Sequence, residues 1–348
     1  MAKTIPRVDV PFYHIVLLLA AFGVVAFIDI YSGIFINFAS AQTAPVASCP
    51  TTYTREIPVR NPSELQTALT NAKPGDLISL TDGVYSGRFT ISVSGSASQP
   101  IAICGSANAI LDGGSTKSGY GFHIKNANYI TLSGFSIRNS QKGIMVNGGN
   151  YNTLADLQIY SLGHEAVHFR AFSSYNTIRD SVIHDTGRRD TKYGEGVYIG
   201  SAQSNWCTYT ACKPDKSDYN KVLGNTIGPN ITAEEVDIKE GTTGGLVQGN
   251  TFNGIGMIAS AASSWVNVKG NGYAISQNTG ASSTKNGFSN HVIVSGWGNN
   301  NTFSENVANV LASGYGFWID PSSSGNVVKC DNQVTNAASG FANRVCTP

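Results

Sequence analysis

The charged side chains that could do chemistry are concentrated in the middle of the chain, on short strand-like triplets. When aligned, these triplets begin at Ile144, Val167, Val197, Val236, Val266 and Phe317. The outer residues of each triplet are expected to point inward and the middle one outward, because side chains alternate along a strand. Arg170, Lys239 and Lys269 then share one outward column. The two lysines would lie on adjacent units, about 5 Å apart at their backbones, which suits an extended anionic substrate such as a polyuronate.

β-Elimination of a uronate is the chemistry that these residues predict. The carboxylate must be neutralised so that the α-proton becomes acidic, a base must remove that proton, and an acid must protonate the leaving oxygen. We expect Lys239 to be the base, with a pKa lowered by the like charge of Lys269 one unit away. His168 and Tyr198 also point outward and are further catalytic candidates. Stacking on a sugar ring is the alternative role for Tyr198.

Acidic residues beside the lysines predict a metal site. Glu235 and Asp237 oppose the lowering of the Lys239 pKa unless a metal ion neutralises them. A hard cation such as Ca²⁺, bound by Glu234, Glu235 or Asp237, would remove this opposition and hold the substrate carboxylate. The alternative is a solvated face on which these carboxylates form salt bridges with the lysines.

Substrate contacts are expected from the same face and from the insertion beside it. The residues assigned to substrate binding are Arg170, Asn267, Trp265, Trp318 and Arg188. The tryptophans would stack on sugar rings. Arg188 begins an insertion between about residues 187 and 218, which would rise beside the face as the wall of a cleft.

Three other functions remain open on the same residues. A uronan C5-epimerase would use the same proton abstraction as a lyase. A glycoside hydrolase would need two carboxylates between about 5 and 9.5 Å apart, and Asp237 with Glu235 or Asp156 could supply them. A non-catalytic carbohydrate-binding or cell-wall structural protein would bind polysaccharide without releasing an unsaturated product.

Repeats in the sequence predict the elements that position these residues. Motifs such as Tyr-Asn-Thr-Leu at 151–154 recur every 24 to 28 residues, except in one unit of 44 residues that carries the insertion. Short apolar alternations between Gly and Asn turns at this period are typical of a solenoid. We therefore predict an all-β protein, a single-stranded parallel β-helix of roughly ten coils, in which Asn residues at equivalent turn positions form hydrogen-bonded ladders.

Composition agrees with this fold and limits the partners. Only 13% of the 348 residues are charged, against about 25% in an average soluble protein. This scarcity argues against a helical bundle, and the net charge of +1 argues against a nucleic-acid binder that relies on a strong positive field. An acidic polysaccharide is the expected partner, and we expect the protein to act as a monomer.

A capping helix is predicted before the repeats. Asn61, Pro62 and Glu64 stand in the order of an N-cap, a first helical residue and a capping-box acid. A helix here would cover the open end of the first coil, where strand edges are otherwise unpaired. The predicted domains are an N-terminal segment with this helix at residues 42–75 and the β-helix at 76–348.

The N-terminus has the pattern of a signal peptide. Lys3 and Arg7 precede the apolar run Ile15–Ile28, and Ala39-Ser40-Ala41 resembles a cleavage site. We predict that residues 1–41 are removed and that the protein is secreted, with no stable membrane association afterwards; an uncleaved N-terminal anchor is the alternative.

Cysteine usage agrees with an extracellular location. Six cysteines after the signal peptide allow three disulfides in fifteen pairings. The sequence favours local pairing without fixing it: Cys49–Cys104, Cys207–Cys212 and Cys330–Cys346.

The chain resembles a known superfamily at two places. Residues 69–85 resemble the entry of secreted right-handed β-helix proteins of the pectate-lyase-like superfamily, and residues 234–239 with 249–252 resemble polysaccharide lyase family 6. The second resemblance implies that Glu234 binds Ca²⁺ and that Lys239, five residues later, is catalytic. Lys269 occupies the place of that family's catalytic Arg, whereas Thr232 stands where a second calcium-binding Glu is expected.

Overall fold

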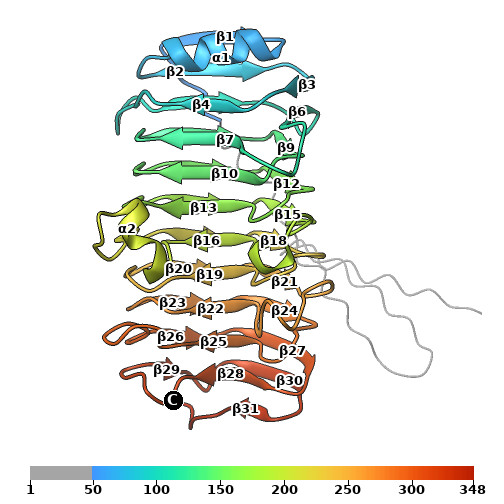
Figure 1. Cartoon of the computed structure of the whole chain (residues 1–348), viewed down its shortest axis with the longest axis vertical. Helices are drawn as coiled ribbons and strands as arrows, with labels where there is room; N and C mark the ends of the chain where they lie inside the picture. Colours follow the sequence, from blue (N-terminus) through green and yellow to red (C-terminus); the bar gives the residue numbers. More distant parts are fainter. Residues whose placement is uncertain (1–48) are drawn as a thin grey trace, which may run out of the picture. The chain divides into compact units, whose positions relative to one another are not determined.

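The computed structural model describes residues 49–348, so the predicted signal peptide lies outside the described part of the chain. The described residues form a right-handed parallel β-helix of about ten coils (Figure 1), as the sequence predicts. Each coil contributes one strand to each of three sheets, and the strands of successive coils pair in parallel. None of the helices in the described residues is long and apolar enough to cross a membrane.

Within the described residues, sheets 1 and 2 contain eleven and ten strands. Sheet 1 contains β1 (Arg55–Val59), β2 (Asp76–Leu80), β5 (Ile101–Cys104), β8 (Ile130–Ser133), β11 (Thr153–Ala155), β14 (Thr177–Arg179), β17 (Lys221–Leu223), β20 (Leu246–Gln248), β23 (Ala274–Ser276), β26 (Thr302–Ser304) and β29 (Val327–Val328). Sheet 2 contains β3 (Gly83–Ser86), β6 (Ala109–Asp112), β9 (Ser136–Arg138), β12 (Gln158–Tyr160), β15 (Val182–His184), β18 (Thr226–Ile227), β21 (Thr251–Asn253), β24 (Thr279–Ala281), β27 (Val307–Ala312) and β30 (Gln333–Ala337).

Sheet 3 contains the aligned triplets. Its strands are β4 (Phe89–Ile91), β7 (Tyr120–Lys125), β10 (Lys142–Asn147), β13 (Val167–Arg170), β16 (Val197–Ile199), β19 (Val236–Ile238), β22 (Val266–Val268), β25 (Phe288–Asn290), β28 (Tyr315–Ile319) and β31 (Gly340–Ala342). Val197 pairs with Val167 on one side and Val236 on the other, and Val236 pairs with Val266. The register predicted from the sequence is therefore confirmed for these coils.

The interior is filled by stacked apolar side chains and closed at the turns by asparagines. Inward residues of sheet 3, such as Phe288 and Phe317, stack ring on ring with centroids 5.2 Å apart. At one corner, the amide nitrogens of Asn225 and Asn250 each donate to the side-chain oxygen of the asparagine one coil further on, at 2.9 Å. The predicted asparagine ladder is thus present, and it pairs backbone and amide groups that water cannot reach.

The N-terminal end is covered by α1 (Pro62–Asn71). The side chain of Asn61 accepts a hydrogen bond from the backbone N–H of Glu64 at 2.9 Å, as the capping pattern predicts. Apolar residues of this helix, including Leu65 and Leu69, are fully buried against the first coil. One strand was not anticipated: β1 precedes the helix and pairs with β2, so the sheet begins before residue 76.

All six cysteines are paired in the locally favoured pattern: Cys49–Cys104, Cys207–Cys212 and Cys330–Cys346. The first bridge ties residues ahead of β1 to sheet 1. The second lies in the insertion beside sheet 3, and the third secures the C-terminus.

Candidate functional site

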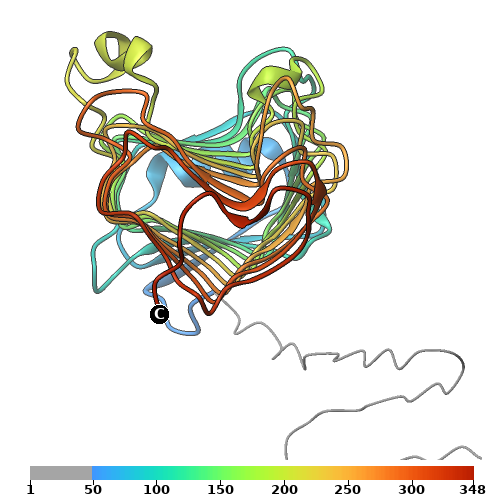
Figure 2. The same ribbon diagram turned by 90° about the horizontal axis from the view of Figure 1, so that it is seen from below.

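Two inserted segments flank the outer face of sheet 3. One carries the 3₁₀ turn η1 (Thr191–Tyr193) before β16, and the other carries η2 (Gln203–Asn205) and α2 (Trp206–Tyr209) after it. Seen along the coils, the two segments project from opposite edges of the same face (Figure 2). The predicted insertion therefore rises beside the face, but it consists of two segments separated by the strand that carries Tyr198.

An aspartate lies between the two lysines at the centre of the face. Lys239 Nζ is 2.6 Å from Asp237 Oδ2, and Lys269 Nζ pairs with Asp237 Oδ1. Burial alone would lower the pKa of Lys239, but the charge of Asp237 and its hydrogen bond outweigh burial and hold this pKa above its ordinary value. The expectation that Lys269 lowers the Lys239 pKa is therefore wrong for the protein alone, because the carboxylate is closer than the second ammonium.

Tyr198 packs against the same lysine. Lys239 Nζ lies 4.9 Å from the centroid of the Tyr198 ring, within the range of a cation–π contact. Burial raises the pKa of Tyr198 well above its ordinary value, although the Lys239 charge acts in the opposite direction. The phenol is thus protonated at neutral pH, and its ring is only partly covered.

Three buried carboxyl groups approach one another beside this pair. One oxygen each from Glu195, Glu234 and Asp237 lie within 4.8 Å of one another. Burial, together with the neighbouring acids, raises the pKa of Glu195 well above its usual range, and burial and Asp237 raise that of Glu234. This donor set fits a hard cation with oxygen ligands, because oxygens on opposite sides of a shared Ca²⁺ lie about 5 Å apart.

Glu235 does not belong to this group. Its side chain is fully buried inside the coil, and neither carboxylate oxygen has a hydrogen-bond partner. β19 begins only at Val236, so Glu235 lies in the turn before the strand, where strand alternation does not hold. The predicted metal ligand Glu235 is therefore replaced on the outer face by Glu195 from the preceding coil.

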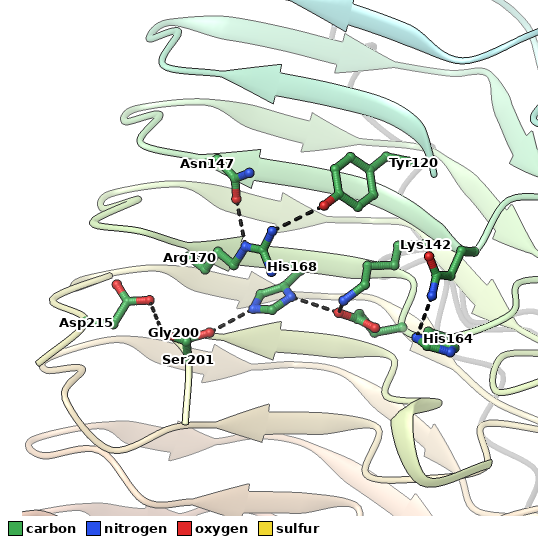
Figure 3. Close-up of polar contacts among 11 residues, drawn as sticks. Tyr120, Lys142, Asn147, His164, His168, Arg170, Gly200, Ser201 and Asp215 are labelled. Carbon is green, nitrogen blue, oxygen red and sulfur yellow. Dashed lines mark hydrogen bonds and ion pairs between the residues drawn. The ribbon is translucent and has the colours of Figure 1, made fainter. Parts of the chain in front are cut away.

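His168 is part of a buried polar network (Figure 3). Its Nε2 lies 2.8 Å from the carbonyl oxygen of Gly200, and its Nδ1 lies 2.8 Å from Glu165 Oε1, which also pairs with Lys142. Burial lowers the pKa of His168, whereas the hydrogen bond to Glu165 raises it. Because both ring nitrogens already have partners, His168 is better placed to fix the strand beside Tyr198 than to exchange protons with a substrate.

Arg170 has an ordered set of partners (Figure 3). Its Nε donates to Asn147 Oδ1 at 2.9 Å, and its Nη2 donates to the Tyr120 hydroxyl at 3.2 Å. The guanidinium carbon lies 3.9 Å from the centroid of the Tyr209 ring. Arg170 and Lys239 occupy the same outward column two strands apart, with Gly200 between them.

Gly200 stands between these two cations in the column, at a position where a side chain does not fit. Its φ of 82° lies in the left-handed region, and a Cβ there would come within 2.5 Å of Thr242 Cγ2. A larger residue is therefore disfavoured by both backbone strain and sterics.

The remaining predicted substrate contacts fall in different places. Asn267 donates to Glu234 Oε1 at 2.8 Å and faces His291, whose ring lies 4.6 Å from that of Trp318. Asn267 and Trp318 thus lie on the outer face. Arg188 is exposed on the η1 segment, where it donates to Ser161 Oγ at 3.1 Å.

Trp265 has to be corrected, because its side chain lies wholly in the interior against Phe288. It cannot stack on a sugar without the coil opening. Like Glu235, it precedes a strand by one residue and faces inward.

Sequence reasoning missed Glu165, Glu195 and Tyr209 among the residues of the site. Glu165 and Glu195 stand two residues before their triplets, in one outward column with the predicted Glu234. Extending the alignment by one more position would have revealed this column. Tyr209 comes from the insertion, which has no register with the coils, so no sequence signal placed it.

Comparisons with known proteins agree with this fold. Residues 52–213 match a family model described as the Pel9A-like right-handed β-helix region. The solved alginate lyase from Paenibacillus sp. str. FPU-7 is 38% identical, with a TM-score of 0.79; the match covers 84% of this chain and 100% of that one. A comparison with curated proteins gives no match.

Two more distant structures share the fold. Pectate lyase Pel9A is 17% identical over 82% of this chain and 78% of its own, with a TM-score of 0.56. A mutant of the family 6 alginate lyase AlyGC is 14% identical over 82% of this chain and 40% of its own, with a TM-score of 0.54. The described coils thus share the parallel β-helix fold of these two proteins. The chain belongs to the same family of right-handed β-helix polysaccharide lyases as the Paenibacillus enzyme.

Proposed function

We propose that this protein is secreted and cleaves an acidic polysaccharide of the alginate type by β-elimination. The observation that carries the proposal is the Lys239–Tyr198 pair on the outer face of sheet 3, in a chain 38% identical to an alginate lyase. The three disulfides support secretion, since such bonds persist in oxidising compartments.

The substrate carboxylate would be neutralised by cations along the outward column. Arg170 is held by Asn147 and Tyr120, so its guanidinium is fixed before substrate arrives. A fixed fork of N–H donors matches a carboxylate in two parallel hydrogen bonds. Neutralising the negative charge of the substrate carboxylate makes the proton on C5 of the uronate more acidic.

The proton transfers would be divided between Lys239 and Tyr198. Neutral Lys239 takes the C5 proton, the electron pair of the C–H bond forms the C4=C5 double bond, and the C4–O bond breaks. The departing oxygen takes a proton from the Tyr198 hydroxyl, which burial keeps protonated. Lys269, whose ammonium is buried against Asp237, is better suited to orient that aspartate than to act as the acid.

Lys239 can accept a proton only when the Asp237 carboxylate no longer stabilises the protonated, positively charged form of the lysine. Asp237 also belongs to the cluster with Glu195 and Glu234, which together would hold a cation. A divalent cation such as Ca²⁺, when bound there, supplies positive charge that offsets the carboxylates. The Lys239 pKa would then fall toward the value that a general base needs.

The lyase proposal is tested by incubating residues 42–348 with alginate, polygalacturonate and glycosaminoglycans. We expect ultraviolet-absorbing 4,5-unsaturated ends from alginate. If none of the polymers yields such ends while polysaccharide still binds, the protein is a carbohydrate-binding module rather than a lyase.

Removal of divalent cations is expected to lower the alginate-cleaving rate by at least tenfold, because Asp237 then keeps Lys239 protonated. Added Ca²⁺ should restore the rate. Glu195→Gln should weaken Ca²⁺ binding in calorimetry, whereas Glu305→Gln, at an exposed site, should not. An unchanged rate in chelator, together with wild-type activity of Glu195→Gln, would remove the cation from the proposal.

A further inference from the structure

We propose that Tyr209 is a positioning residue that fixes Arg170 for recognition of a uronate carboxylate, and that the Cys207–Cys212 bridge holds Tyr209 in place. The inference rests on the proposed function, because the carboxylate in question is that of the polyuronate. It concerns a segment outside the coils, in the insertion between β16 and β17.

The guanidinium of Arg170 is enclosed on several sides but keeps donors for a ligand. Asn147 and Tyr120 accept hydrogen bonds from Nε and from one N–H of Nη2. The Tyr209 ring covers one face of the guanidinium, with 3.9 Å between the guanidinium carbon and the ring centroid. An arginine carries five N–H donors, and within residues 49–348 no protein acceptor pairs with Nη1. The contacts therefore fix the plane of the fork and leave one edge for a carboxylate.

The insertion is anchored to the strand end that carries Arg170. The Asp215 carboxylate accepts hydrogen bonds from the backbone N–H groups of Ala171 and Phe172, at 3.0 and 2.9 Å, and from Ser201 Oγ at 2.7 Å. Asp215 and Ser201 lie beside Gly200 in Figure 3. The base of the insertion and the backbone after Arg170 thus share one fully buried carboxylate.

The tip of the insertion is closed by its own bridge. Cys207 and Cys212, five positions apart in the sequence, are joined by a disulfide, and Tyr209 lies within this small ring. Trp206, just ahead of it, is buried and donates from Nε1 to the Ser201 carbonyl at 2.9 Å. Tyr209 is exposed, and the closed ring limits the backbone motion that would otherwise carry it away from the guanidinium.

This arrangement has a direct consequence for substrate specificity. A planar cation held between two hydrogen-bond acceptors and an aromatic face favours a planar anion over a neutral hydroxyl group. Tyr209 thereby contributes to selecting a sugar that bears a carboxylate, without touching the reacting atoms.

The test compares Tyr209→Ala with Tyr209→Phe on alginate. A cation–π contact contributes about 0.5–2 kcal/mol, or roughly 2- to 30-fold. We expect the Ala variant to raise KM in that range with kcat changed less than twofold, and the Phe variant to restore KM. Cys207→Ser with Cys212→Ser should raise KM similarly. Controls are Tyr53→Ala and the pair Cys330→Ser with Cys346→Ser, which lie outside sheet 3 and its insertions.

A double-mutant cycle separates action through Arg170 from direct contact with sugar. If Tyr209 acts through Arg170, Tyr209→Ala should have no further effect on KM in an Arg170→Gln background. Full additivity of the two effects would overturn the positioning role. So would an unchanged KM in Tyr209→Ala while the wild type still releases unsaturated ends, and that result would leave the lyase proposal intact.

A wild type that releases no unsaturated ends would refute the lyase proposal instead. The dissociation constant for alginate oligosaccharides then decides whether Tyr209 contributes to recognition of the carboxylate. Weaker binding by Tyr209→Ala than by Tyr209→Phe supports carboxylate recognition. Equal binding by the two variants, or no binding by the wild type, overturns it.

Discussion

Replacing Lys239 with alanine is expected to lower kcat on a polyuronate by about 10²–10⁴-fold, the usual contribution of a general base. The chain should remain folded, because Asp237 keeps its ion pair with Lys269 when Lys239 is shortened. The rate of formation of unsaturated ends measures the effect, and thermal unfolding checks the fold. Lys221→Ala is the matched control, since Lys221 is an exposed lysine on sheet 1.

An arginine at the same position distinguishes two roles for the cation. Arginine keeps the positive charge but does not release its proton in a protein. If Lys239 removes the C5 proton, Lys239→Arg should be as inactive as Lys239→Ala. If Lys239 only neutralises the substrate carboxylate, the arginine variant should keep much of the wild-type rate. Wild-type activity in Lys239→Ala would exclude this lysine from the chemistry altogether.

The fold could be read from the sequence because a β-helix repeats its local rules. Each coil needs a pair of apolar residues that point inward from its strand. It also needs a turn whose buried polar groups are paired by hydrogen bonds. Triplets such as Val197–Ile199 and asparagines such as Asn225 and Asn250 therefore recur at a regular distance. Parallel pairing brings equivalent positions into register, so the columns of the outer face follow from the alignment.

The site was only partly predictable, for three physical reasons. Alternation holds within a strand and fails one residue before it, so Glu235 and Trp265 face inward although the pattern placed them outside. The sequence alignment also did not determine the distances between charged side chains on the outer face. Asp237 lies close enough to both lysines to reverse the expected pKa shift of Lys239. The third reason is that the insertions have no register with the coils, so nothing in their sequence places Tyr209 over Arg170.

Replacing Glu235 with glutamine is expected to stabilise the protein at neutral pH by about 1–3 kcal/mol, because ionisation of Glu235 in the unfolded chain costs the folded state about 1.4 kcal/mol per pH unit and glutamine does not ionise. Burial raises the pKa of the Glu235 carboxyl well above its ordinary value, and the nearby backbone N–H of Asn253 offsets only part of this effect. In the unfolded chain the same carboxyl ionises near a pKa of about 4.3.

The sign of the pH dependence follows from this difference. Below about pH 4 both states hold the proton, so Glu235 favours neither of them. As the pH rises toward the folded-state pKa, the unfolded chain releases its proton while the folded chain keeps it, and unfolding becomes progressively easier. Glutamine cannot ionise, so the substitution removes this penalty while preserving size and shape.

Thermal unfolding of the two proteins between pH 4 and 8 tests this prediction. The melting temperatures should coincide at the acidic end and separate as the pH rises, with Glu235→Gln the more stable; Glu305→Gln, at an exposed position, should show no such divergence. A constant difference at every pH would mean that Glu235 is ionised in the folded coil as well. The interior would then have to supply it with a partner, and Trp265, at the same position of the next coil with an unpaired indole N–H, is the group to examine first.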